Sequence, residues 1–128
     1  MITALFRSIP IRLGASLALT GAIAFLSLVP GYPQEGDAKL VVMIGSVPSL
    51  LQNAMHVALY ALLTVLWAAA LVRFKRPILL AALFATGYGA LLEFAQLFAS
   101  GRYASLFDIG LNTAGVLIGV AVAASLTT

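Results

Sequence analysis

The chain has 128 residues, of which 62% are hydrophobic and only 9% are charged. This composition and a mean hydropathy of +1.10 exclude an ordinary soluble domain and favour a single polytopic membrane domain, residues 1–128. The net charge of +3 comes from basic residues that form no stripe, which argues against a nucleic acid partner, and the absence of cysteine excludes disulfides and thiol chemistry.

Four apolar segments approach the length of roughly 20 residues that a helix needs to cross a bilayer. We predict membrane-spanning helices at about residues 13–30, 53–72, 78–98 and 106–126. The predicted fold class is therefore all-α, an integral membrane bundle of four transmembrane helices.

The first span follows Arg7 and Arg12, much as the apolar core of a signal peptide follows its positive region. Residues 22–24 (Ala-Ile-Ala) even supply a small-x-small pattern. The apolar run continues to Val29, however, so cleavage there would cut inside it. We therefore expect the first span to be retained as a transmembrane helix.

The connections differ in length and character. The loop 31–51 begins polar and turns apolar over residues 40–44, a run too short to span, which suits a re-entrant or interfacial segment. Pro48 is predicted to mark the start of the second helix. The short basic linker 73–77 predicts a tight antiparallel pair of spans two and three, and Gly101 lies where a C-cap glycine would follow the third.

The basic residues predict the orientation of the bundle. Only Lys39 and Arg102 flank one set of helix ends. The other set is flanked by the remaining five of the seven, Arg7, Arg12, Arg73, Lys75 and Arg76. The positive-inside rule then predicts that both termini are cytoplasmic.

Polar and small residues of three spans are predicted on one face of each helix, since they recur at spacings of three and four. The three stripes are Asn53, His56, Tyr60, Thr64 and Trp67; Thr86, Gly89, Glu93 and Gln96; and Asp108, Asn112, Gly115 and Gly119. The members predicted in the outer half of the bilayer are Asn53, His56, Tyr60, Glu93, Gln96, Asp108 and Asn112. We therefore predict a polar pocket in the outer leaflet, above a floor where Gly115 and Gly119 let another helix approach closely.

Glu93 and His56 are the strongest candidates for chemistry in this pocket. A carboxylate in the last turns of a spanning helix demands a partner, and the cations predicted at that depth are His56 and Arg102. A contact between His56 and Glu93 would form a catalytic acid–base pair near neutral pH. Arg102, beside the amide-rich start of the last span, would suit a phosphate or carboxylate group. The expected substrate-binding residues are Tyr60, Gln96, Arg102, Asp108 and Asn112.

Structural interpretations compete with these roles. Asp108 follows Ser105 at the spacing of a capping box, so it can satisfy amides at the start of its helix. Gln96 and Asn112 could equally serve as hydrogen-bond partners between helices. Arg102 could anchor the chain at the level of the lipid headgroups, and Tyr60 and Trp67 could be packing residues. The predicted site offers one histidine and two carboxylates, and they do not follow the spacing of a known metal-binding motif, so we expect no metal site. We also expect no cofactor. No serine lies in a sequence motif typical of a catalytic nucleophile.

The spacing of these residues resembles the VanZ-like family of small integral membrane proteins. The resemblance is carried by His56-x-x-x-Tyr60 and by a longer run, Glu93-x-x-Gln96, Arg102, Asp108-x-x-x-Asn112-x-x-Gly115-x-x-x-Gly119. The order and spacing of the longer run are specific, whereas the first span matches only in its hydrophobicity. Members often carry an Asp-Lys pair shortly before the histidine, where this chain has Gln52-Asn53, so a role that needs those charges does not carry over.

The resemblance implies a multi-pass protein of the bacterial cytoplasmic membrane that serves the cell envelope. The name-giving member is associated with resistance to the lipoglycopeptide teicoplanin. We therefore expect binding or modulation of a lipid-linked headgroup, or of an amphiphilic antibiotic, at the outer face. The alternative is a membrane enzyme that acts on a lipid-linked envelope substrate through His56 and Glu93.

Two further functions are less favoured. A transporter would need a continuous polar path, which the inner halves of the spans do not offer. A subunit of an assembly, or a homo-oligomer formed through Gly115 and Gly119, would use the small-residue surface of the last span.

Overall fold

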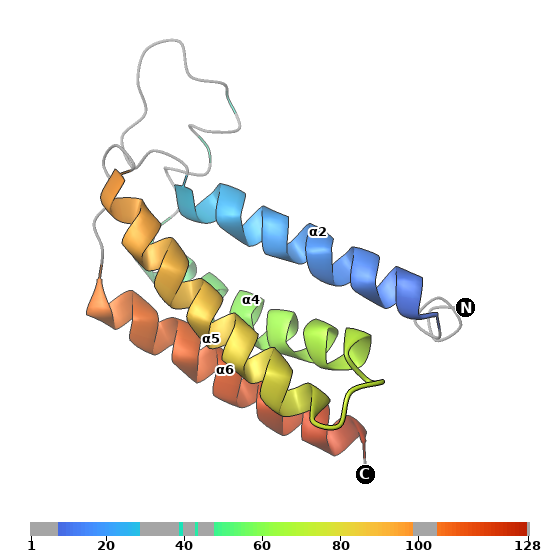
Figure 1. Cartoon of the computed structure of the whole chain (residues 1–128). Coiled ribbons are helices and arrows are strands. Elements are labelled where there is room, and N and C mark those ends of the chain that lie inside the picture. The colour runs from blue at the N-terminus through green and yellow to red at the C-terminus, as the bar shows by residue number, and fades with distance from the viewer. Residues whose placement is uncertain (1–7, 29–38, 40–42, 44–47, 99–104, 128) are drawn as a thin grey trace.

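The computed structural model describes residues 8–28, 39, 43, 48–98 and 105–127, and the long elements among them are all helices. In chain order they are α2 (Ile9–Leu28), α4 (Ser49–Ala70), α5 (Pro77–Ala95), the 3₁₀ turn η1 (Gln96–Phe98) and α6 (Leu106–Leu126) (Figure 1). The predicted all-α fold is confirmed for this part of the chain. The predicted bounds of the last span agree with α6, and those of the others differ by a few residues.

Local chemistry explains where the helices begin. Pro48 directly precedes α4, as predicted, and Pro77 occupies the first turn of α5, where its missing N–H costs no hydrogen bond. Ser105 is the N-cap of α6, and its Oγ accepts the N–H of Asp108 at 3.3 Å. The predicted feature at Gly101 and most of the loop 31–51 lie outside the described residues.

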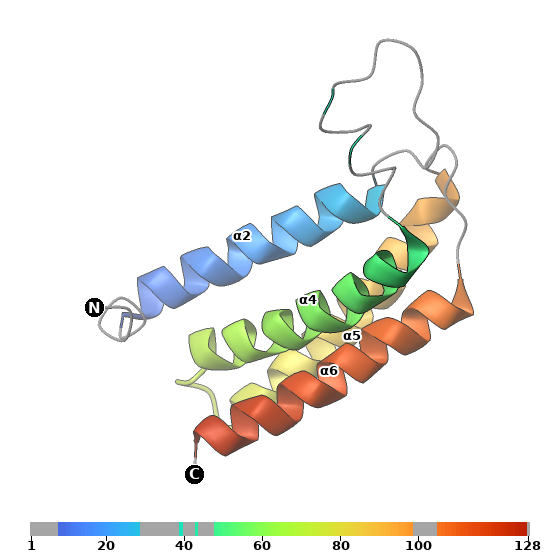
Figure 2. The same cartoon turned by 180° about the vertical axis from the view of Figure 1, so that it is seen from behind.

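The helices lie lengthwise beside one another (Figures 1 and 2). The contact between α4 and α6 is the most extensive, and α2 packs mainly on α4 and less on α5. One end of the bundle, the basic end, holds the start of α2, the α4–α5 turn and the end of α6. The other, the polar end, holds the end of α2, the start of α4, η1 and the start of α6. The predicted tight antiparallel pair of α4 and α5 is therefore present.

The core is built from a mixed apolar cluster and a cluster of small residues. The larger cluster consists of Ile23, Tyr60, Leu63, Ala85, Leu92 and Val116. The smaller one, toward the basic end, consists of Ala68, Ala81 and Ala123. The small side chains let α4, α5 and α6 approach closely there.

Gly115 and Gly119 form the predicted small-residue seam, and their neighbour is α4 of the same chain. A Cβ atom at Gly119 would lie 2.6 Å from the carbonyl oxygen of Ala61, and one at Gly115 would collide with the carbonyl oxygen of Val57. Both glycines are buried. A homo-oligomer would therefore have to form through another surface, and oligomerisation itself stays a prediction.

Most long apolar side chains point outward. Within the described residues, four helices are long and apolar enough to cross a membrane, and at most 28% of any of these spans is buried. Leu50, Leu83, Leu91 and Leu117 are each more than half exposed. Exposing such side chains to water costs roughly 25 cal/mol per Å², so this surface belongs against lipid acyl chains. The chain is a multi-pass membrane protein.

One predicted inward position on the third span is wrong. Thr86 is exposed, and the buried face of α5 runs instead through Ala81, Ala85 and Gly89. Each residue advances about 100° around a helix, so Thr86 lies about 60° from Gly89 in one direction and Ala85 about 40° in the other. The buried face is centred between Ala85 and Gly89, which leaves Thr86 on its rim.

Candidate functional site

Buried polar side chains gather near the polar end, where α4, α5, η1 and α6 meet. Their relative exposures are small, 3% for Glu93 and 4% for both Gln96 and Asn112. Tyr60 is also buried and His56 is half-buried. Three separate helices and η1 therefore deliver polar groups to one region, as the periodicity of the sequence predicts.

His56 on α4 and Asn112 on α6 form the best-defined contact of this region. Nδ1 of His56 and Oδ1 of Asn112 are 2.7 Å apart. An amide oxygen only accepts hydrogen bonds, so Nδ1 carries the proton that joins them. In the neutral ring Nε2 then holds the lone pair, which makes it the atom able to take a proton or accept a hydrogen bond from a ligand.

Glu93 joins the end of α5 to the start of α6. Its Oε1 accepts the backbone N–H of Ser105, the N-cap residue of α6. A carboxylate at this place also faces the positive end of the helix dipole. The described hydrogen bond of His56 goes to Asn112 and that of Glu93 goes to Ser105, so the predicted acid–base pair of His56 and Glu93 stays a prediction.

Tyr60 fills the centre of the three-helix junction, and two glycines make room for it. A Cβ atom at Gly89 would lie 2.9 Å from Cε1 of Tyr60 and 3.1 Å from Nδ2 of Asn112. One at Gly115 would lie 3.0 Å from Cβ of Tyr60. Packing thus accounts for the position of Tyr60, and its predicted ligand contact is untested.

The remaining predicted site residues are Gln96, Asp108 and Arg102. Gln96 donates from Nε2 to the carbonyl oxygen of Ser27 at 2.8 Å, and so ties η1 to the end of α2. Asp108 is half-buried in the first turn of α6, where a negative charge is favoured by the helix dipole. Arg102 lies outside the described residues.

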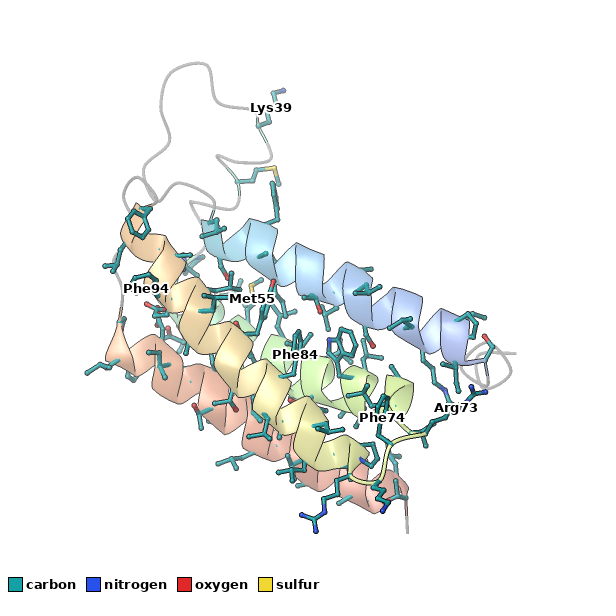
Figure 3. All side chains as sticks on the ribbon, viewed as in Figure 1. Lys39, Met55, Arg73, Phe74, Phe84 and Phe94 are labelled. Carbon is teal, nitrogen blue, oxygen red and sulfur yellow. The ribbon has the colours of Figure 1, made fainter. Side chains whose placement is uncertain are left out.

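A second polar network, in the middle of the bundle, was not predicted from the sequence. Thr20 on α2 accepts the indole N–H of Trp67 at its Oγ1, 3.0 Å away, and the hydroxyl of Tyr88 at its carbonyl oxygen, 2.7 Å away. Phe84 lies beside both aromatic rings, with centroid distances of 5.0 Å to Trp67 and 5.5 Å to Tyr88 (Figure 3). The sequence signal for this network was Thr20, a hydroxyl residue in a mostly apolar span.

This arrangement can bind polar groups and can move a proton at Nε2 of His56. No group of three potential metal ligands lies together within the described part of the chain. A cavity of about 350 Å³ opens among the described residues, but at the basic end, lined among others by Arg12 and Ala123. The predicted outer-leaflet pocket therefore stays a prediction.

A comparison with protein families matches residues 1–127 to the family described as VanZ/LLP1. The matched region includes all four long helices and every residue of the predicted site. The comparisons with curated proteins and with solved structures gave no match.

Proposed function

Since the chain belongs to the VanZ-like family of integral membrane proteins, we propose that it binds or modulates a lipid-linked headgroup at the polar end of the bundle. An amphiphilic antibiotic of the lipoglycopeptide type is the second ligand class that this site would take. The observation that carries the proposal is the convergence of His56, Glu93 and Asn112 in a chain whose spans are largely apolar. Polar groups at membrane depth are costly unless they are paired or used.

The chemistry of the site favours a headgroup with both acceptor and donor atoms. Nε2 of His56 accepts a hydrogen bond from a hydroxyl when the ring is neutral and donates to a phosphate when the ring is charged. The exposed cation Lys39, near the same end, adds attraction for an anionic group (Figure 3). The lipid portion of such a ligand would lie against the apolar outer faces of the helices.

The binding test uses purified protein in lipid nanodiscs and two probes, a fluorescent polyprenyl diphosphate and fluorescently labelled teicoplanin. We expect His56→Ala and Asn112→Ala each to weaken binding of at least one probe by about ten-fold, the effect of losing one or two hydrogen bonds. Thr86→Val is the matched control, because Thr86 is an exposed polar residue of α5. Equal binding by His56→Ala, Asn112→Ala and Thr86→Val would refute the proposal.

The orientation that this function needs has the polar end outside and both termini in the cytoplasm, in the bacterial cytoplasmic membrane. The positive-inside rule supports it, because Arg73, Lys75 and Arg76 lie together at the basic end. The chain has no cysteine, so single-cysteine variants report directly on sidedness. In intact cells, a membrane-impermeant maleimide should label Lys39→Cys and leave Lys75→Cys unlabelled until the membrane is opened. The reverse labelling would contradict this orientation.

An enzyme is the second candidate function, favoured by one observation. The Asn112 contact fixes Nδ1 of His56 as the protonated nitrogen, which leaves Nε2 as a base in the same polar region as a buried carboxylate, Glu93. Such a site would catalyse proton transfer in hydrolysis or group transfer on a lipid-linked envelope substrate. Turnover of the polyprenyl diphosphate probe should then disappear in a His56→Ala, Glu93→Gln double variant, and unchanged turnover would exclude this role.

A further inference from the structure

The basic end of the bundle contains a cavity that the proposed function does not use. The cavity measures about 350 Å³ and lies between α2, α4, α5 and α6. Its walls include Val65, Ala68, Ile78 and Ala123, and its lining is largely apolar. A largely apolar lining offers few partners to water, which needs two to four polar contacts to be held in place.

Arg12 places a positive charge at this otherwise apolar cavity. It is the charged residue among the described lining, and its Nη1 donates to the carbonyl oxygen of Ala69 at 3.3 Å. That bond connects α2 to the last turn of α4 and holds the guanidinium beside the cavity. The backbone carbonyl fixes one edge of the group, so the position of the charge is set by the fold.

The α4–α5 turn adds more positive charge at the same end. Arg73, Lys75 and Arg76 are all exposed, and Pro77, the next residue, lines the cavity. Figure 3 shows Arg73 and Phe74 at this end of the bundle. The described acidic residues, Glu93 and Asp108, both belong to the polar end.

We propose that the basic-end cavity binds an anionic phospholipid, with an acyl chain in the cavity and the headgroup phosphate against Arg12 and the cations of the turn. An apolar chamber within a membrane fills with acyl chains, and clusters of Lys and Arg at a membrane surface attract anionic headgroups. A partner helix does not fit this chamber, because a helix with its side chains is about 10 Å wide. This site is separate from the polar end, so the proposal does not depend on the proposed function.

The test titrates the detergent-solubilised protein with phosphatidylglycerol or phosphatidylcholine of identical acyl chains and counts bound lipids by native mass spectrometry. We expect phosphatidylglycerol to bind preferentially. The triple variant R73Q/K75Q/R76Q should lower this binding by up to about a hundred-fold, given about five-fold for each of three cations near a membrane surface. K39Q removes one exposed charge at the opposite end and should leave the binding unchanged.

A second pair of variants tests the acyl chamber itself. Ala123→Leu fills the cavity and should lower phosphatidylglycerol binding, whereas Ala124→Leu, at the exposed neighbouring position of α6, should not. Inorganic phosphate at millimolar concentration should not compete, because it lacks the acyl chain. Equal binding of the two lipids, or equal loss in the triple variant and K39Q, would overturn the proposal. If Ala123→Leu fails to fold, the charge variants decide the matter alone.

Discussion

Gly119 gives the sharpest test of the bundle, because its position leaves no room for a side chain. A Cβ atom there would lie 2.6 Å from the carbonyl oxygen of Ala61 and 2.7 Å from Cβ of Thr64. Overpacking of this kind costs about 1–3 kcal/mol, and two fixed parts of α4 place Gly119→Ala near the upper value. Alanine regains about 1 kcal/mol of helix propensity over glycine. We therefore expect the free energy of unfolding to fall by about 2 kcal/mol.

Gly110 supplies the matched control on the same helix. It is exposed, and nothing lies within 4 Å of an added Cβ atom. Gly110→Ala keeps the propensity gain without the clash, so the two variants should differ by about 3 kcal/mol. The assay is reversible unfolding in dodecyl maltoside micelles with increasing SDS, followed by circular dichroism. Equal midpoints for the two variants would mean that α4 and α6 do not touch at Gly119.

Three further substitutions test the polar contacts. Glu93→Ala removes the acceptor of the Ser105 N–H, so amide hydrogen exchange in the first turn of α6 should speed up by about ten-fold. Trp67→Phe keeps an aromatic ring, though a smaller one, and loses the N–H donor to Thr20, so it should destabilise the bundle by at least about 0.6 kcal/mol in the SDS assay. No change would show that this bond is not needed to hold α2. His56→Ala leaves a buried amide oxygen of α6 without its donor and should cost about 1–3 kcal/mol, and a neutral result would argue against that contact.

Much of the fold follows from patterns that the sequence displays openly. Hydropathy locates the four helices, and Ser105 three residues before Asp108 locates the start of α6. The glycine spacing predicts a close helix contact, because a small-xxx-small surface has few other uses in a membrane. Depth and rotation also bring His56 and Asn112 to one region. These predictions succeed because each depends on one helix and its period.

The partners of individual side chains could not be predicted in the same way. Glu93 binds a backbone N–H, and nearly every residue carries one, so composition gives no hint of which amide it will meet. Thr86 was misplaced because its stripe was drawn from polarity, whereas packing centred the buried face on small residues. Thr20 was overlooked because its backbone carbonyl does part of the binding. Such contacts depend on how two helices are rotated toward each other.

The glycines link the packing of the bundle to its polar site. Gly115 brings α6 against the backbone of Val57, the residue next to His56, and Gly89 leaves the space that Tyr60 and Asn112 occupy. A side chain at either glycine would push apart the helices that carry the 2.7 Å contact between His56 and Asn112. The polar groups therefore meet because small residues allow three backbones to approach. In this chain the seam that stabilises the helices also sets the geometry of the site.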